Sequence, residues 1–502
     1  MRTTRMRRIV GTCALALGAL VVSASATAGE LSLDAPPEIS LGDATLTPHF
    51  SNRMRGEFAD WFAPGPSAAP DDDNSYQFFA NVMHFGARLK HPQFGLFVDG
   101  QYVALAGLPN HAKGLGPGAV YFANNRRDNP GEVFLREGYL TIPDLGVEGL
   151  ALARGGRFKF NDGLENLDAT KDPMLKWVKK MRVSQRLVGA FDYTHAGRSF
   201  DGGALSYDRG PYNLTFMGGQ PTAGGFNVSA NPHIDGIFLT YLAATVTEPE
   251  WLPRSDMRLF HLYYEDARDL VATDNRPLSL READQGRDIQ IHTIGANFER
   301  IYPLGPGAMD VMWWVAGQTG DWQSQDHGAW AVAAEAGYRF AEVPWTPWMR
   351  VGYFRSSGDG DPDDGDHESF FQVLPTARLY ALTPFFNLMN NQDVFWQLIM
   401  KPHPSLVVRT DYHYLEVASD DDLVYAGGGA TQQDRIFGYA GFPARGANSV
   451  AHFVDLTLIW NVNRHLQFWA YYGHAFGQSV IGRQFAESKQ LDYAFLESTI
   501  KW

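Results

Sequence analysis

The chain begins with a secretory leader, and no later stretch is apolar enough to cross a membrane as a helix. The leader has a basic start, an apolar run over 9–22 and a small-x-small cleavage site at Ala26-Thr27-Ala28. The longest nearly apolar stretch after it, 236–246, is far below the roughly 18 residues that a membrane helix needs. A closed β-sheet is the other structure that satisfies every backbone group in lipid, so we expect a β-barrel.

Two-residue alternation is the dominant pattern of the mature chain. Between residues 330 and 340, apolar side chains alternate with a face that carries Glu335 and Arg339, and 406–414 repeats the pattern. In a soluble β-sandwich the apolar face would be the core, whereas in a large barrel it faces lipid and the charged face lines a wet lumen. We therefore expect a charge at Val332 or Tyr412 to face lipid, and a neutral residue to be accepted in place of the inward carboxylates.

The alternation predicts an all-β fold, a transmembrane antiparallel barrel of eighteen strands, an even number that returns both termini to the periplasm. Short turns rich in Gly, Pro, Asn and Asp alternate with long connections, such as 107–130, 162–197, 358–392 and 418–449, which we expect to fold over the outer mouth. The predicted strands lie near 45–61, 76–91, 93–106, 131–142, 150–161, 198–208, 211–221, 233–247, 256–266, 288–299, 308–321, 328–341, 347–357, 393–402, 404–417, 450–462, 464–476 and 490–502.

The predicted organisation is a signal peptide over 1–28, a periplasmic lead-in over 29–44 and the barrel over 45–502. The final strand predicts a bulge or slip, because 496–502 places Leu, Ser, Ile and Trp at every second position whereas Tyr493 and Phe495 fall in the opposite phase.

Charge and cysteine content exclude two classes of function. Removing the four leader arginines from 42 basic residues leaves 38 against 56 acidic residues, which makes the mature net charge −18 and argues against a nucleic-acid binder. The only cysteine, Cys13, lies in the leader, so disulfides and thiol chemistry are excluded from the mature chain.

Several short stretches follow one another in order from about residue 150 to the end. They are Gly156-Arg157-Phe158-Lys159-Phe160-Asn161-Asp162-Gly163, Gly197-Arg198-Ser199-Phe200-Asp201-Gly202, the aspartate-rich 358–365 followed by Phe370 and Leu374-Pro375-Thr376, and Val454-Asp455-Leu456-Thr457-Leu458 before Asn463-Arg464-His465-Leu466. This ordered combination resembles the alginate export family of Gram-negative outer membranes. The resemblance implies an eighteen-stranded barrel whose electropositive lumen passes an anionic polysaccharide, such as an alginate-like polyuronate, outward. It singles out Arg157 and Arg198, which lie in the resembling stretches.

The phase opposite the apolar face gives a predicted lumen lining in which basic side chains outnumber acidic ones. The predicted inward residues are Arg53, Arg55, Glu57, Arg88, Lys90, Asp99, Gln101, Arg136, Arg157, Lys159, Glu335, Arg339, Arg350, Arg409, Asp411 and Asp455. Guanidinium groups bind uronate carboxylates in a fork geometry, and a ladder of weak sites lets a polyanion pass. The alternative interpretation is that these charges only solvate the wall and pair across strands, as Arg409 would with Asp411.

Two connections carry further candidate sites. The stretch 359–368 does not match an EF-hand, because Asp364 stands where glycine is needed and Phe370 where the closing glutamate belongs. It is either a solvated, self-repelling outer loop or a loop metal site whose ligands would be Asp359, Asp361 and Asp363. The segment 172–180 predicts a short basic amphipathic helix with Pro173 in its first turn, which either rests on lipopolysaccharide phosphates or packs its loop.

The tryptophan-rich strand ends predict anchoring at the membrane interface, with carbohydrate stacking as the lesser interpretation. The residues are Trp313, Trp314, Trp345, Trp348, Trp396, Trp460, Trp469, Tyr471 and Tyr472.

An enzyme is the competing class, because His84, His413, His465 and His474 could each serve as a base, but no motif gathers them. We therefore expect a channel without a cofactor. A general or small-solute porin is the alternative, and an outer-membrane hydrolase is less favoured. The expected partners are an anionic polysaccharide, outer-membrane lipid and lipopolysaccharide, with no nucleic acid. We expect a monomer, and the sequence leaves open whether a periplasmic export complex is engaged.

Overall fold

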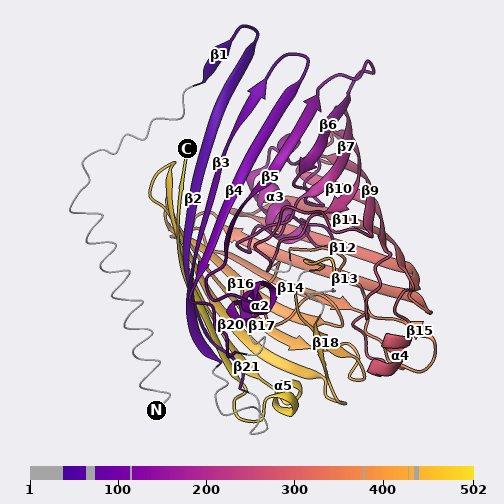
Figure 1. Ribbon diagram of the computed structural model, residues 1–502. Helices are drawn as coiled ribbons and strands as arrows, with labels where there is room; N and C mark the ends of the chain where they lie inside the picture. The colour runs from indigo at the N-terminus through magenta and orange to yellow at the C-terminus, as the bar shows by residue number, and fades with distance from the viewer. Residues whose placement is uncertain (1–37, 64–73, 113–115, 377–378, 428, 435–439) are drawn as a thin grey trace. The chain divides into compact units, whose positions relative to one another are not determined.

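The structure is a computed structural model that describes residues 38–63, 74–112, 116–376, 379–427, 429–434 and 440–502 (Figure 1). The predicted signal peptide and most of the predicted lead-in lie outside these residues. The end of the lead-in forms a short strand, β1 (Ile39–Leu41), that pairs with the start of the next strand.

Eighteen antiparallel strands form a closed barrel, which confirms the predicted fold class. Each predicted strand has an observed counterpart whose ends lie within a few residues of the expected ones. The strands are β2 (Ala44–Asp60), β3 (Ser75–Lys90), β4 (Gly95–Ala106), β5 (Gly131–Ile142), β6 (Leu150–Phe158), β7 (Phe200–Arg209), β8 (Tyr212–Pro221), β9 (Ile237–Thr247), β10 (Ser255–Asp266), β11 (Ile289–Leu304), β12 (Gly307–Trp322), β13 (Gln325–Phe340), β14 (Trp348–Ser356), β16 (Gln392–His403), β17 (Leu406–Glu416), β20 (Ser449–Asn461), β21 (Leu466–Gly477) and β22 (Gln490–Lys501). The barrel closes between the first and last of them, where Ser51 pairs with Lys501 and Asp60 with Asp492.

One end of the barrel, the turn end, carries the short turns and the start of β2, and the other, the loop end, carries the long connections. We name these connections L2 (107–130), L3 (159–199), L4 (222–236), L5 (267–288), L7 (357–391) and L8 (417–448). Short helices lie in them: α2 (Gly116–Asn125) in L2, α3 (Pro173–Val178) in L3 and α4 (Leu278–Ala283) in L5, with α5 (Ser479–Gln484) between the last two strands. L7 also holds β15 (Asp366–His367), which pairs with β13, and L8 holds the hairpin of β18 (Leu423–Tyr425) and β19 (Gly441–Pro443). No helix in the described part of the chain is long and apolar enough to cross a membrane.

The two faces of the wall follow the predicted alternation. Trp330 and Tyr412 are 44% and 40% exposed on the outer face, whereas Glu335 and Asp411 on the same strands are 4% and 1% exposed. The outer face is a continuous display of large apolar side chains, among them Val133, Leu259, Ile294 and Trp313, each about 60% exposed. Such a surface is stable in hydrocarbon and costly in water.

An arginine at Val332 is expected to hinder assembly of the barrel. Val332 lies on the outer face, two residues from Trp330, so the charge would enter the hydrocarbon at a cost of roughly 2 to 4 kcal/mol near the bilayer midplane. Heat-modifiable mobility after folding into liposomes measures the folded fraction. Val332→Thr is the matched control, and equal folding of the two variants would contradict the observed register.

L3 enters the barrel instead of folding over its mouth, and this corrects the predicted wet lumen (Figure 1). Leu175 and Val178 of α3 pack in one apolar cluster with the inward-facing Phe260 and Trp314. Phe191, farther along L3, packs with inward residues of β3, β4 and β5. The interior beside these parts of L3 is therefore filled with packed side chains.

The predicted helix within 172–180 is present as α3, with Pro173 in its first turn and Asp172 as the N-cap residue. The Asp172 carboxylate accepts hydrogen bonds from the backbone N–H groups of Met174 and Leu175 at 2.8 and 3.0 Å. The helix packs inside the barrel, where the Trp177 ring contacts Trp348 at 4.6 Å between ring centroids. Packing of the loop, and not contact with lipopolysaccharide, is thus the role that the structure gives it. Interface anchoring was likewise wrong for Trp348, which faces inward.

The predicted bulge in the last strand is also wrong. β22 keeps an unbroken register with both neighbours. Tyr493 and Phe495 face inward, where the Tyr493 hydroxyl donates to Glu57 at 2.7 Å and the Arg55 guanidinium lies 4.4 Å from the centre of the Phe495 ring. Aromatic residues suit the inner face here because L3 covers them and keeps water away.

Candidate functional site

A cavity of about 370 Å³, which we name the lumen cavity, lies on the inner wall beneath L3. Its floor and sides come from β2, β3, β4 and β5, with Thr499 of β22, and L3 covers it from the loop end. Its polar lining includes His49, Ser51, Arg53, His84, Asp99, Gln101, Glu137, Lys159, Asp192, Thr194 and Thr499. Seven of these residues carry ionisable side chains, so the cavity is charged on nearly every side.

Three cations gather around Asp192 of L3, and we name this arrangement the cradle: Arg53, Arg136 and Lys159 around Asp192. Arg53 and Lys159 line the lumen cavity, whereas Arg136 is buried. Arg136 Nη2 lies 2.7 Å from Asp192 Oδ1, and Lys159 Nζ lies 3.7 Å from Asp192 Oδ2. Arg53 holds the same turn of L3 through the carbonyls of Asp192 and Thr194, at 2.9 and 2.6 Å. The Arg136 side chain is only 1% exposed, but that of Asp192 is 52% exposed toward the cavity.

The cradle strongly favours a negative charge at its centre. Burial would raise the pKa of Asp192, but the nearby charges of Lys159 and Arg136 outweigh burial and hold that pKa well below its usual range. A carboxylate in this position is therefore ionised at every physiological pH.

Elsewhere in the lumen cavity, two histidines share one carboxylate. Asp99 accepts from His49 at 2.9 Å and from His84 at 2.8 Å, so this carboxylate is already bonded on both oxygens. Toward the turn end, the Arg88 guanidinium lies 5.1 Å from the centre of the Phe97 ring, and Lys90 is exposed at the end of its strand. These two basic side chains form the charged approach to the cavity.

Arg157 does not line the lumen, which corrects its predicted position. It pairs across β6 and β7 with Asp201 in a two-pronged ion pair, at 2.7 and 2.6 Å, whereas the adjacent Phe158 and Phe200 are fully buried on the inner face. The cause is a β-bulge between Leu152 and Arg154, because one extra residue moves every later side chain to the other face.

The bulge gives β6 a lumen arginine that the sequence analysis missed. Arg154 faces inward, with its guanidinium 5.7 Å from the Tyr139 ring centre and 5.9 Å from that of Phe158. The nearby pair Gly155-Gly156 was the available signal, since Gly156 has a φ of +128° that side chains rarely adopt.

Four other predicted lumen arginines are held in ion pairs or ring contacts. Arg55 pairs with Glu497 at 2.7 Å, Arg350 with Asp310 at 2.8 Å and Arg409 with Asp411 at 2.9 Å. Arg198 lies within L3 with its guanidinium 5.2 Å from the Phe191 ring centre. The wall-pair interpretation therefore fits these positions better than direct ligand contact.

Three basic residues of L3, which we name the pins, were not predicted to bind the barrel wall. They attach L3 to the wall opposite the cradle. Lys179 Nζ lies 2.6 Å from Asp256 Oδ2, and Arg182 Nε lies 2.7 Å from Glu335 Oε2, with all four side chains buried. Arg186 adds a contact to Glu335 at 3.5 Å. L3 thus contacts opposite sides of the barrel, through the cradle and through these pins, and it crosses the lumen. The signal in the sequence was the cluster of cations at 179–186, together with carboxylates at inward positions of the strands.

The aspartate-rich part of L7 forms hydrogen bonds within its own loop. The described residues contain no group of three or more His, Cys, Asp or Glu side chains that could hold a metal ion. Asp359 and Asp361 instead accept from backbone N–H groups two residues ahead, each at 3.1 Å. These carboxylates order the loop itself.

A carboxyl pair joins L7 to L8. The Asp422 carboxylate accepts from the Asp359 backbone at 3.0 Å, from Ser369 Oγ at 2.5 Å and from the Tyr425 hydroxyl at 2.8 Å. Burial raises the pKa of Asp422 to about 6, and burial together with the charge of Asp422 raises the pKa of Asp359 to about 7.

Docking of L7 on L8 is expected to weaken as pH rises. An unfolded aspartate ionises near pH 4, so the stabilisation from the raised pKa values is complete below about pH 4 and is lost by about pH 7. Hydrogen-exchange protection factors over 357–369 should therefore fall between about pH 4 and about pH 7, while those of α2 stay constant. Asp422→Asn should remove most of the change, and an unaltered pH dependence in that variant would contradict this assignment.

The four candidate histidines have structural partners. His84, His413 and His474 each bond to an aspartate at 2.8 Å, and His465 bonds to the Lys501 carbonyl at the same distance. These arrangements orient imidazoles within the wall and place no nucleophile beside them in the bonds described.

Comparisons with known proteins agree with this architecture. The solved structures that resemble the chain include the outer membrane protein OpdK of Pseudomonas aeruginosa (TM-score 0.52, 11% identity, 91% of this chain and 98% of that chain covered). They also include OccAB2 of Acinetobacter baumannii (TM-score 0.55, 10% identity, 91% and 98% covered) and OccK2 of P. aeruginosa in complex with glucuronate (TM-score 0.53, 11% identity, 91% and 96% covered). These likenesses show the fold of an outer-membrane β-barrel. No curated protein matches the sequence.

The sequence model of the alginate export family, in contrast, matches residues 49–486, which include seventeen of the eighteen barrel strands almost completely. This range contains L3, every cation of the cradle and all of the lining of the lumen cavity except Thr499. The chain therefore belongs to the alginate export family and is a β-barrel protein of the bacterial outer membrane.

Proposed function

We propose that this protein is an outer-membrane channel that exports an anionic polysaccharide, an alginate-like polyuronate, past the cradle of the lumen cavity. Membership of the alginate export family supports export of a polysaccharide. The observation that carries the proposal is the cradle itself, in which Arg136 and Lys159 hold the carboxylate of Asp192.

The cradle has the chemistry that a uronate carboxylate needs. Arg136 offers a planar guanidinium, and Lys159, which is 28% exposed, offers a mobile ammonium beside it. Asp192 occupies this position as part of L3, so a substrate carboxylate would exchange with it. We propose that this exchange frees L3 and admits the chain, and that Arg88 and Lys90 draw the polyanion toward it.

The protein would perform this function as a channel without enzymatic chemistry or a cofactor, as a monomer in outer-membrane lipid and lipopolysaccharide. A periplasmic export complex would deliver the polymer at the turn end, where Arg88 and Lys90 form the approach.

A small-solute porin is the second candidate, and one observation favours it. With L3 in place, the lumen cavity of about 370 Å³ has the size of a small-ligand site, and the similar barrel OccK2 was solved with glucuronate. A uronate monomer would fit the cradle as well as a polymer does.

Planar-bilayer recording of the mature protein separates these functions. Reversal potentials across a salt gradient should show preference for anions despite the net charge of −18, because charges on a narrow wall act on a passing ion directly and those on outer loops are screened over roughly 8 to 10 Å. A uronate trisaccharide should block the current, and Lys159→Gln should weaken the block about tenfold, as expected for loss of a charged hydrogen bond of roughly 1.5 kcal/mol.

Arg157→Gln is the matched control, because Arg157 lies two residues away on the outer face. If Lys159→Gln and Arg157→Gln weaken block by the trisaccharide equally, the cradle is not the site at which the trisaccharide blocks the channel. Passage of the glucuronate monomer without any block by the trisaccharide would favour the porin. A channel that prefers cations would contradict both proposals.

A further inference from the structure

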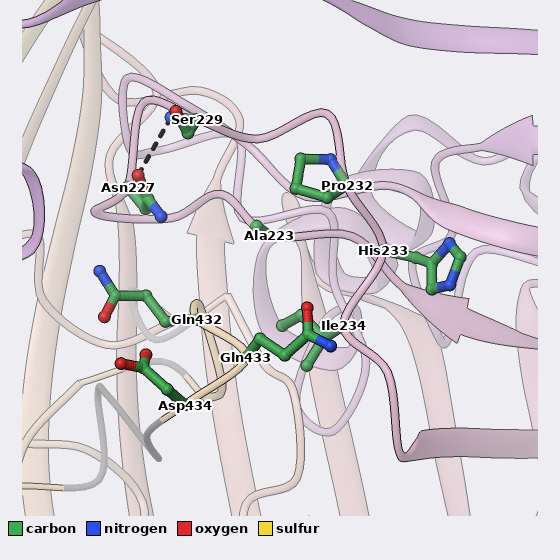
Figure 2. A pocket seen from close by; sticks show the side chains of 9 residues that line it. All are labelled: Ala223, Asn227, Ser229, Pro232, His233, Ile234, Gln432, Gln433 and Asp434. Atoms are coloured by element: carbon green, nitrogen blue, oxygen red, sulfur yellow. Dashed lines mark hydrogen bonds between the residues drawn. The ribbon is translucent and has the colours of Figure 1, made fainter.

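A second cavity, of about 350 Å³, lies at the loop end between L4 and L8, far along the chain from the cradle residues (Figure 2). We name it the L4–L8 cavity. L4 contributes Asn227, Ser229 and His233, and L8 contributes Gln433 and Asp434. No part of the function proposed above uses it.

The walls of the L4–L8 cavity are held in place by side-chain amides that bond to backbone. Asn125 of α2 donates to the Phe226 carbonyl at 2.9 Å and accepts from the Val228 N–H at 3.0 Å, which fixes L4. Gln432 donates to the Asn124 carbonyl at 3.1 Å, and Arg268 donates to the Gln432 carbonyl at 2.7 Å, which fixes L8. A cavity with fixed walls loses little freedom when a ligand binds.

The lining combines uncharged donors and acceptors with a small apolar surface. The Asn227 side-chain oxygen accepts from the Ser229 N–H at 3.0 Å, the contact that Figure 2 marks with a dashed line, and its NH₂ group remains to donate. Gln433 donates its NH₂ group to Asp235, so its oxygen remains to accept. Pro232, which is exposed, supplies apolar surface beside them, and Ile234 is buried beneath the lining.

Most of the charges near this cavity have the opposite sign to those of the cradle; the cation Arg268, which donates to the Gln432 carbonyl, is paired with Asp266 at 2.6 Å. Asp434 lines it, Asp235 bonds to Gln433 and to His233 Nε2 at 2.9 Å, and Glu132 accepts from Ser229. A ligand carboxylate would be repelled here, whereas a sugar hydroxyl can donate to these acids and accept from the amides.

From these observations we propose that the L4–L8 cavity is a binding site for neutral saccharides, which it recognises through pyranose hydroxyls and a non-polar ring face. The site goes beyond the proposed export function, because it selects the uncharged part of a carbohydrate and is lined by residues that the cradle does not use. A glycan that meets the outer mouth would bind here whether or not the lumen carries a polyuronate.

Titration calorimetry on the intact mature protein tests the site, in a detergent without a sugar headgroup, since such a headgroup would compete. The probes are a neutral mannose trisaccharide and the matching mannuronate trisaccharide. The neutral sugar should bind saturably and more tightly than the uronate, and Asn227→Ala combined with Gln433→Ala should weaken its binding at least tenfold. Gln433→Glu, which places a second carboxylate beside Asp235, should weaken it as well.

Gln285→Ala, an exposed amide on L5, is the matched control and should leave binding unchanged, as should Lys159→Gln in the cradle. Absence of binding by the neutral sugar, tighter binding of the uronate, or binding that survives the Asn227 and Gln433 substitutions would each overturn the proposal. Block of the channel by the uronate trisaccharide reports on the cradle alone, so failure of either proposal can be recognised without the other.

Discussion

Shortening L3 is expected to raise the single-channel conductance by an order of magnitude or more, since an eighteen-stranded barrel encloses a water-filled channel when nothing fills it. Asp162 N donates to the Val188 carbonyl at 2.9 Å, so a Gly-Gly linker can replace 163–187 without moving the ends that remain. This deletion removes α3 and the pins Lys179, Arg182 and Arg186, and it leaves the cradle in place. Water that enters the lumen then solvates the wall carboxylates.

Planar-bilayer recording measures the conductance, and replacement of α4 by the same linker is the control. α4 lies in L5 and contains no buried residue, so its loss should leave the conductance unchanged. A deletion of 163–187 that assembles and conducts like the wild type would show that L3 does not restrict the channel.

Glu335→Gln is expected to destabilise the barrel by roughly 3 to 5 kcal/mol, the range for removal of one partner from a buried ion pair. Glu335 bonds to Arg182 and Arg350 at 2.7 and 2.9 Å and contacts Arg186 at 3.5 Å, all buried. Neutralising it leaves three buried guanidinium groups with too little negative charge. The structure thus reverses the expectation that an inward carboxylate accepts a neutral residue.

Guanidinium unfolding in liposomes, followed by tryptophan fluorescence, measures this loss. Asp326→Asn, at an exposed position on the same strand, is the control and should change stability by less than about 0.5 kcal/mol. Arg182→Met combined with Glu335→Gln should recover part of the loss, because one unbalanced cation is removed. If Glu335→Gln lowers the free energy of unfolding no more than Asp326→Asn does, the buried network contributes nothing to stability.

The strands could be predicted from the sequence because their alternation reports directly on which face meets lipid. The same pattern says nothing about what fills the inside. Glu335 and Arg350 were correctly placed on the inner face, but alternation alone could not show that L3 brings Arg182 and Arg186 to them. These contacts join residues that are 153 positions apart in the case of Arg182 and Glu335, and no local pattern carries them.

The candidate site shows the second limit. Lys159, Arg53 and Arg136 were predicted to line the lumen and do meet in the cradle, but their partner Asp192 lies in a loop without periodicity. Arg157 was misplaced because a single inserted residue in β6 inverts the faces of everything that follows it in the strand. The phase of Tyr493 and Phe495 was interpreted as a bulge. It instead places two aromatic side chains on the inner face, which indicates that the interior there is covered.

The position of L3 also constrains the order in which the barrel can assemble. Its partners are spread from Arg53 of β2 to Tyr493 of β22, whose hydroxyl lies 3.3 Å from that of Tyr193. These strands become neighbours only when the first and last close the sheet, so L3 cannot complete its contacts with both of them earlier. Docking of L3 is therefore completed last, and a chain arrested before β22 joins β2 would leave the part of L3 around Asp192 and Tyr193 open to protease. Resistance of this loop to protease would thus report that the barrel has closed.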